Sequence, residues 1–213
     1  MKKNTIGHLQ PIELPAPAFS RCRTVFEALK ARRTCRLYKD RKVRVQVLSD
    51  LLWAAQGINR KRGPFGGPGR TAGSASNSQE IRIYVALEEG IYLYEPEAHR
   101  MNPISMGDHR ALAIGPGQGR AGANAPVRLI YVVDKDKFKS AGFQEPGLHD
   151  REIQKSYYFV DTGLIAQNVY LAAASLGLAS WFHNCNKAAL EKLLDLKPGR
   201  RALFGQTIGF PAE

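Results

Sequence analysis

Apolar residues recur every three or four positions in two early segments of the chain. This spacing over 24–33 and 45–57 predicts two amphipathic helices. Thr24 is suited to begin the first helix and Gly57 to end the second. A further short helix is predicted over 187–196, where Pro198-Gly199 would end it.

A period of two, which is typical of a strand, runs from Ile81 to Leu87. Glu89-Gly90 then predicts a turn, so that this segment and 91–94 form a hairpin. An apolar run over 127–133 predicts a strand covered on both faces, and a closing strand is expected over 203–210. We expect an α+β layered fold in which helices outnumber strands.

The stretch 157–179 is the most apolar of the chain, and its length approaches that of a membrane span. Asp161, Gln167, Asn168 and Ser175 are spread along it and would need polar partners in lipid. We therefore expect a long buried helix at a subunit interface, and no membrane span.

The 213 residues, 44% hydrophobic and 23% charged, predict one enzyme-sized domain over 21–213, preceded by an extended arm over 1–20. A net charge of +12 favours an anionic partner, but the charge alone admits a cofactor, a dinucleotide, nucleic acid or a membrane surface. The basic start lacks the apolar core of a signal peptide. The default location is cytoplasmic, and a mature exported form with its leader removed stays open.

The three cysteines, Cys22, Cys35 and Cys185, form neither a Cys-x-x-Cys pair nor an even set. No metal site and no disulfide are therefore predicted. Cys185 follows His183 by two positions, but a structural thiol is favoured over a Cys-His nucleophile, because neighbours in sequence lack the geometry of such a pair.

A cluster of cationic and hydroxyl groups lies where the first predicted helix ends: Arg32, Arg33, Thr34 and Arg36. A guanidinium binds phosphate through two parallel hydrogen bonds, and the Thr34 hydroxyl adds a compact donor. Arg32 and Arg36 share a face if the helix continues, and the loop can wrap an anion if the helix breaks at Thr34. The alternative is a basic helix end that complements its own dipole.

Small residues over 71–78 leave the backbone free to approach a flat ligand, and Ser74, Ala75, Ser76 and Asn77 are the candidates for contact. An ordinary surface loop would have the same composition. Two glycine-rich segments, 63–69 and 115–119, lack the lysine and helix of a phosphate loop. We interpret both as mobile loops at the rim of a pocket, with Gln118 able to reach a ligand.

Taken in order, several motifs resemble the flavin-dependent nitroreductases, and among them the SagB-type or azoline-oxidase-like dehydrogenases. The resemblance covers most of the chain. It rests on Arg32–Arg36, Leu51–Arg60 (LLWAAQGINR), Gly73–Gln79, Gly90–Pro96 (GIYLYEP), Asn124–Val127, Asp161–Asn168 and Gly209–Pro211.

This resemblance implies a three-layer fold, in which helices flank a central, mostly antiparallel sheet, and an intertwined homodimer. It also implies bound FMN that takes hydride from NADH or NADPH and passes it to a small electron-poor acceptor, such as a nitroaromatic or a quinone. Arg32, Arg33, Thr34 and Arg36 would then hold the phosphate and the ribityl chain.

The same resemblance implies that Ser74, Ala75, Ser76 and Asn77 line the flavin, commonly from the partner subunit. A loop over 181–184, with Phe182 and His183, and Gln118 would lie near the ring. His183 is the best candidate for tuning the ring or donating a proton, because imidazole titrates near neutral pH. No catalytic residue is assigned.

The chain departs from the family pattern at three points. Gly73 replaces the usual Pro, and Glu80 stands where Pro commonly follows. The family often supplies a further Lys or Arg to the phosphate after the closing strand, but this sequence stops at Glu213. The phosphate charge would have to be met elsewhere.

Two alternative functions stay open. The SagB-like motifs suggest a dehydrogenase or oxidase of peptide-derived heterocycles. The net charge and the run Arg60-Lys61-Arg62 admit a non-enzymatic binder of nucleic acid or another polyanion. Nucleic acid is not expected as a partner, because no helix-turn-helix, zinc-finger spacing or aromatic RNA-binding strand is recognised.

Overall fold

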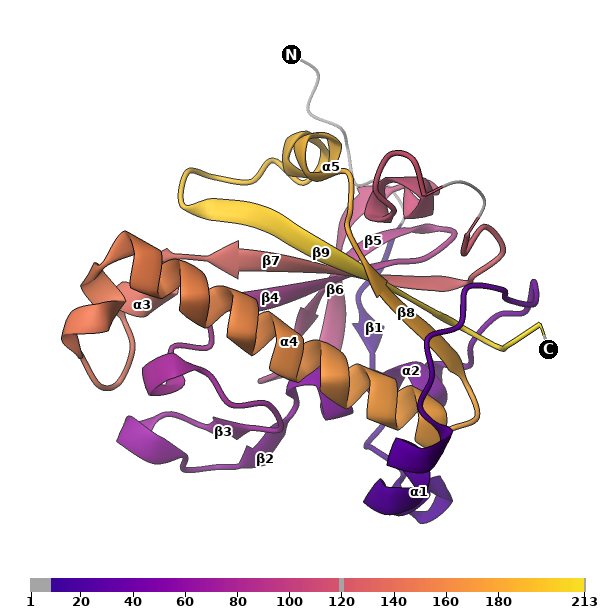
Figure 1. Ribbon diagram of the computed structural model, residues 1–213, viewed down its shortest axis with the longest axis horizontal. Helices are drawn as coiled ribbons and strands as arrows, with labels where there is room; N and C mark the ends of the chain where they lie inside the picture. The colour runs from indigo at the N-terminus through magenta and orange to yellow at the C-terminus, as the bar shows by residue number, and fades with distance from the viewer. Residues whose placement is uncertain (1–8, 119–120, 213) are drawn as a thin grey trace.

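The fold is built on a seven-stranded sheet in the order β1-β6-β5-β4-β7-β9-β8, with antiparallel neighbours throughout (Figure 1). The computed structural model describes residues 9–118 and 121–212. The strands of this sheet are β1 (Ile12–Glu13), β4 (Ile81–Ala86), β5 (Gly90–Glu95), β6 (Arg100–Met106), β7 (Val127–Asp134), β8 (Ala179–His183) and β9 (Arg200–Gly209). A separate hairpin pairs β2 (Ile58–Arg60) with β3 (Gly69–Arg70).

Helices cover both faces of the sheet, so the predicted three-layer α+β fold is confirmed. On one face, Leu51 of α2 and Val169 of α4 pack in the same core as Leu129 of β7. On the other face, Ile130 packs with Leu190 of α5. The α-helices are α1 (Val25–Ala31), α2 (Val45–Gln56), α3 (Asp136–Lys139), α4 (Arg151–Ser175) and α5 (Lys187–Leu193), and the 3-10 helices are η1 (Phe19–Arg21), η2 (Pro64–Gly66), η3 (Ala75–Asn77), η4 (Arg110–Ala113) and η5 (Pro146–His149).

The expectation that helices outnumber strands holds only when 3-10 helices are counted, since the described residues form nine strands, five α-helices and five 3-10 helices. β6 carries Pro103 and alternates poorly, and β1 and β3 have two residues each, so a period of two is not recognisable in them. Tertiary pairing with longer neighbours stabilises such strands, and a local pattern does not contain that information.

The starts and stops of the first two helices follow the sequence signals. Thr24 Oγ1 accepts from the backbone N–H of Glu27, while the Glu27 carboxylate accepts from the backbone N–H of Thr24, which completes a capping box. Gly57 caps the end of α2. Because α1 ends at Ala31, Arg32 and Arg36 do not share a helical face.

The predicted long helix exists, but its bounds are earlier than 157–179. α4 begins at Arg151, after Asp150 has capped the backbone N–H groups of its first turn, and it ends before Gly177, which has a left-handed φ of +71°. α4 runs diagonally across the sheet in Figure 1. No helix of the described chain is both long enough and apolar enough to cross a membrane.

The described part of the N-terminal arm is docked on the domain. β1 pairs with β6, and the backbone N–H of Ala18 donates to the Asp50 carboxylate of α2 across 2.8 Å. Residues 1–8 lie outside the described chain, so the arm over 1–20 stays a prediction as a whole.

Candidate cofactor site

The cationic segment 32–36 runs along the edge of the sheet beside β8. Thr34 forms a parallel bridge with Ser180, and the backbone N–H of Cys35 donates to the Ser180 carbonyl across 3.1 Å. The helix break before Arg32 allows this extended course. The segment therefore presents its side chains from a fixed backbone rather than from a loose loop.

Aromatic rings orient two of its guanidinium groups without neutralising them. The Arg32 guanidinium lies 5.5 Å from the centre of the Tyr170 ring, and that of Arg36 lies 5.3 Å from the Trp181 ring. Thr34 Oγ1 lies 3.2 Å from the Tyr170 hydroxyl. No carboxylate among the described residues forms an ion pair with Arg32 or Arg36, so both charges can serve an anion.

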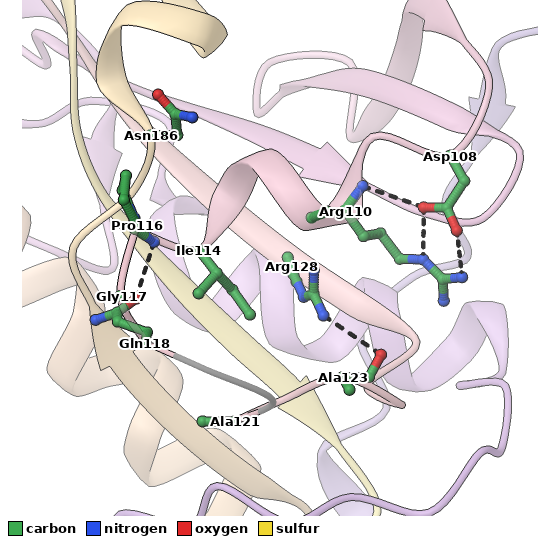
Figure 2. A pocket seen from close by; sticks show the side chains of 12 residues that line it. Asp108, Arg110, Ile114, Pro116, Gly117, Gln118, Ala121, Ala123, Arg128 and Asn186 are labelled. Carbon is green, nitrogen blue, oxygen red and sulfur yellow. Dashed lines mark hydrogen bonds and ion pairs between the residues drawn. The ribbon is translucent and has the colours of Figure 1, made fainter.

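A cleft of about 580 Å³ opens next to this segment, on the face of the sheet opposite α4. Its walls come from the segments 108–118 and 121–123, from Arg128 of β7 and from Asn186 before α5. Figure 2 shows Arg128 near the centre, the Asp108–Arg110 pair on one side and Gln118 and Asn186 on the other. Gly115 to Gln118 line the cleft, which confirms the rim position predicted for this segment, while Gly119 lies outside the described residues.

Gly122 joins the cationic segment to the cleft. Its backbone N–H donates to the Arg36 carbonyl across 2.9 Å, and its own carbonyl accepts from Arg128 Nη2 at 2.7 Å and from the backbone N–H of Ala125 at 3.0 Å. Its φ is +75°, a left-handed conformation that favours glycine.

Electrostatically, the cleft contains one neutral ion pair and one additional cation. Asp108 binds Arg110 in a bidentate way, with distances of 2.9 Å from Nε and 2.7 Å from Nη2. Burial, together with the neighbouring charge of Arg110, lowers the pKa of Arg128 to about 10. Arg128 still carries its proton near neutral pH, so the cleft is net positive.

The segment 181–184, predicted as a loop, is mostly strand, because β8 extends to His183 and pairs with β9. Side chains alternate along a strand, so Phe182 and His183 point to opposite faces. Phe182 packs against Phe204, with ring centres 4.8 Å apart, on the face of α4. The two side chains therefore cannot line one side of a ligand together.

Both ring nitrogens of His183 are engaged beneath the surface. Nε2 lies 2.7 Å from Thr207 Oγ1, and Nδ1 lies 2.8 Å from the Asn184 carbonyl, which requires the proton on Nδ1. Burial lowers the pKa of His183 to about 4, so the ring is neutral near neutral pH. This environment favours a structural role over proton donation.

Gln118 and Cys185, the other two residues singled out near this strand, both have structural roles. Gln118 Oε1 accepts from the backbone N–H of Gly115 at 2.9 Å, so its side chain braces the rim of the cleft. Cys185 is buried, and burial raises the pKa of its thiol to about 11, which confirms a structural thiol.

The turn Ser74–Asn77 lies elsewhere in the same chain. The backbone N–H of Ala75 donates to the Asp161 carboxylate of α4 at 3.0 Å. Asp161 precedes Tyr170, the contact of the cationic segment, by nine residues, which is about 14 Å along a helix. Ser76 and Asn77 hold left-handed φ values of 49° and 55°. One chain thus brings together segment 32–36, Gln118 and His183, but not this turn.

Two buried charged groups were missed from the sequence. Arg128 interrupts the run 127–133, which is therefore not continuously apolar, and a lone charge inside a covered strand was the available signal. Glu80 was noted only as a departure from the family pattern. Its carboxyl is buried, Oε2 accepts from Ser78 Oγ at 2.6 Å, and burial together with Asp161 raises its pKa to about 8.

The sequence profile of the nitroreductase family matches residues 29–210. A protein of Methanocaldococcus jannaschii described as a nitroreductase is 31% identical over 165 residues, which are 72% of this chain and 75% of that protein. The chain belongs to the nitroreductase family, and it is an oxidoreductase by that membership.

Solved structures share the same fold. A nitroreductase-type protein of Ralstonia eutropha JMP134 superposes with a TM-score of 0.82 and 29% identity, over 95% of this chain and 90% of that one. A chain of the Escherichia coli microcin synthetase McbBCD complex, with truncated pro-MccB17 bound, gives a TM-score of 0.70 with 15% identity, over 100% and 79% of the two chains. The latter likeness concerns the fold alone.

Proposed function

We propose that this protein is an FMN-dependent oxidoreductase that passes hydride from NADH or NADPH to a small electron-poor acceptor, such as a nitroaromatic or a quinone. The observation that carries the proposal is the cationic segment 32–36, which is fixed along β8 and joined through Gly122 to the neighbouring cleft.

The donor set fits a phosphate group. The Arg32 and Arg36 guanidinium groups have no carboxylate partner in the described chain, and the Thr34 hydroxyl lies between them in sequence. Arg33 adds a third positive charge. Three guanidinium groups match a phosphate dianion.

The flavin ring of FMN would lie in the cleft. The cleft's volume of about 580 Å³ lies within the range of small-molecule sites, about 300–1,000 Å³. FMN would supply the hydride chemistry there. The protein's own residues would hold and orient the groups that react: Gln118 fixes the rim, Gly117 leaves open space above it, and segment 32–36 anchors the charged end.

A homodimer would complete the site. α4 exposes Val160 and Leu164, 60% and 47% accessible, and α1 exposes Phe26, 84% accessible. Val160 and Leu164 lie one turn apart on α4, so they form an apolar strip that a second copy could cover. The turn Ser74–Asn77 is braced by Asp161 of α4, and segment 32–36 contacts Tyr170 of the same helix, so pairing through α4 would bring this turn near the partner's segment 32–36.

A second candidate is a flavin-dependent dehydrogenase of peptide-derived heterocycles. Parts of the two motifs that resemble the SagB-type branch, Leu51–Arg60 and Gly90–Pro96, line one shallow cleft of about 220 Å³ on the α2 side of the sheet, through Gln56 and Leu93–Pro96. Oxidation of a thiazoline peptide to the thiazole by the FMN-loaded protein, followed by mass spectrometry, tests it.

Absorption spectroscopy tests the leading proposal. The purified protein, or the protein after addition of FMN and gel filtration, should retain a flavin band that bleaches anaerobically with NADH or NADPH and returns on addition of a quinone. A protein that retains no flavin under either condition contradicts the proposal.

A further inference from the structure

We infer that Arg128 recognises a carboxylate on the acceptor, so that the substrates of this enzyme are small organic acids rather than neutral compounds. The inference rests on the proposed function and concerns the same cleft. It is drawn from the buried charge of Arg128 and from the groups that surround it.

The Arg128 guanidinium lies at the base of the cleft and is only partly hydrogen-bonded. The residue is 3% exposed. Nη2 donates to the carbonyls of Gly122 and Ala123, at 2.7 and 3.5 Å, and Nε has no partner among the residues described. A buried donor without a partner is costly, so the arrangement favours a ligand that accepts.

The charge of Arg128 also has no ion-pair partner among the described residues. Asp108, the carboxylate that lines this cleft, is already engaged by Arg110 through both of its oxygens. The three side chains therefore carry a net charge of +1, and a buried cation without an anion is strongly disfavoured. One monovalent anion would balance the cleft.

The other polar side chains of the cleft offer donors in addition. Gln118 uses Oε1 to accept from Gly115, and Asn186 uses Oδ1 to cap α5, so the NH₂ groups of these two lining residues are the donors that they can still offer. A carboxylate matches one cation and neutral donors, whereas a phosphate dianion matches the three guanidinium groups of segment 32–36.

Calorimetric titration of the FMN-saturated protein with benzoate and with benzamide tests this inference. The two probes differ in charge and little in shape. We expect benzoate to bind at least about tenfold more tightly, which is about 1.4 kcal/mol. The preference should vanish in Arg128→Gln, while Arg128→Lys should keep part of it.

Arg201→Gln is the matched control, because it removes the same charge from an exposed position on β9. Arg201 lies six positions from Thr207, which pairs with Arg128, so the two sites are about 20 Å apart. The benzoate preference should be unchanged in this variant. A similar loss in both variants would mean a general charge effect and would overturn the inference.

If Arg128→Gln does not fold, Arg128→Lys reports on Arg128 itself, and Asp108→Asn reports on the charge of the cleft as a whole. Asp108→Asn raises the net charge of the cleft from +1 to +2, so benzoate should bind several-fold more tightly, a gain that misfolding cannot imitate. Unchanged or weaker binding of benzoate would overturn the inference.

Two further measurements show whether Arg128 binds the carboxylate of an acceptor or a phosphate. They also distinguish a failure of this inference from a failure of the proposed function. The ratio of kcat/KM for 4-nitrobenzoate over 4-nitrobenzamide should fall to about one in Arg128→Gln, in line with the loss of one charge-assisted contact. If Arg128→Gln instead weakens FMN and inorganic phosphate while the benzoate preference persists, the anion is phosphate and the inference is wrong. A protein that binds no FMN refutes the proposed function, and its benzoate titration still reports on Arg128.

Discussion

The backbone N–H of Gly122 donates to the carbonyl oxygen of Arg36 across 2.9 Å, and this bond connects two regions far apart in sequence. On one side lies the cationic segment along β8, and on the other lies the cleft that contains Arg128, which donates to Gly122 in turn. A substitution at Gly122 should therefore alter both the cationic segment and the cleft.

Gly122→Ala is expected to weaken FMN binding as well as stability. An added Cβ would lie 3.3 Å from Thr207 and 3.4 Å from Ile114, at a φ of +75°. Strain at such a φ costs about 1–2 kcal/mol, which urea unfolding will measure. Gly66→Ala is the control, because its φ is +81° but its surroundings are open. It should lose similar stability and keep its affinity for FMN, and equal effects on FMN would contradict the coupling.

Glu80→Gln should change how stability depends on pH. The pKa of Glu80 is raised from 4.5 to about 8, so the folded state keeps a proton that the unfolded state loses. The free energy of unfolding should therefore fall as pH rises between these two values, by at most about 1.4 kcal/mol per unit. Glutamine imitates the protonated form, so the variant should show a flatter profile and greater stability near the upper value.

Urea unfolding over this range measures the effect, with Glu89→Gln, an exposed turn position, as the control. A Glu80→Gln profile as steep as that of the wild type would show that the carboxyl ionises freely in the folded protein.

His183 should affect the stability of the protein at acidic pH. Its pKa is lowered from 6.5 to about 4, so the unfolded state gains a proton before the folded state does, and stability should fall as pH falls through this window. His183→Gln should lessen that loss, whereas the exposed His149→Gln should not. Acid unfolding followed by circular dichroism measures both. Parallel acid limbs for the wild type and His183→Gln would contradict a buried neutral imidazole.

A charged residue on the exposed face of α4 should dissociate the proposed dimer into monomers. Val160→Asp places a carboxylate within an apolar face that a second copy would bury, so light scattering should report a monomer. FMN should also bind less tightly, because the partner's Ser74–Asn77 turn is withdrawn. Phe143→Asp is the control, since Phe143 is similarly exposed but stacks on Phe65 in a loop. A dimer that persists in Val160→Asp would place the interface elsewhere.

Much of the fold was predictable where local signals decide the structure. The capping residue Thr24, the stop at Gly57 and the alternation from Ile81 all act within a few residues, and each was confirmed. β8 was missed because its aromatic residues resemble a ligand loop, and its pairing partner β9 lies about twenty positions later. Pairing of this kind is a tertiary contact that a local pattern does not report.

The candidate site was predictable only in part for a similar reason. Arg32, Thr34 and Arg36 were recognisable by their chemistry, but the contact with Gly122 joins positions 86 residues apart. Arg128 was hidden inside an apolar run, where one charge looks like an exception. The turn Ser74–Asn77 lies about 14 Å away along α4, and its role depends on a second chain.

The central claim is that the guanidinium groups of segment 32–36 hold the phosphate of FMN. Fluorescence titration of FMN into the flavin-free Arg32→Ala/Arg36→Ala protein tests it most directly, with Arg62→Ala/Arg201→Ala as a control that removes two exposed charges elsewhere. We predict affinity at least about 100-fold weaker than that of the wild type in the first variant, from two lost charge-assisted contacts, and little change in the control. Equal affinity for FMN in the wild type and the Arg32→Ala/Arg36→Ala protein would contradict the account.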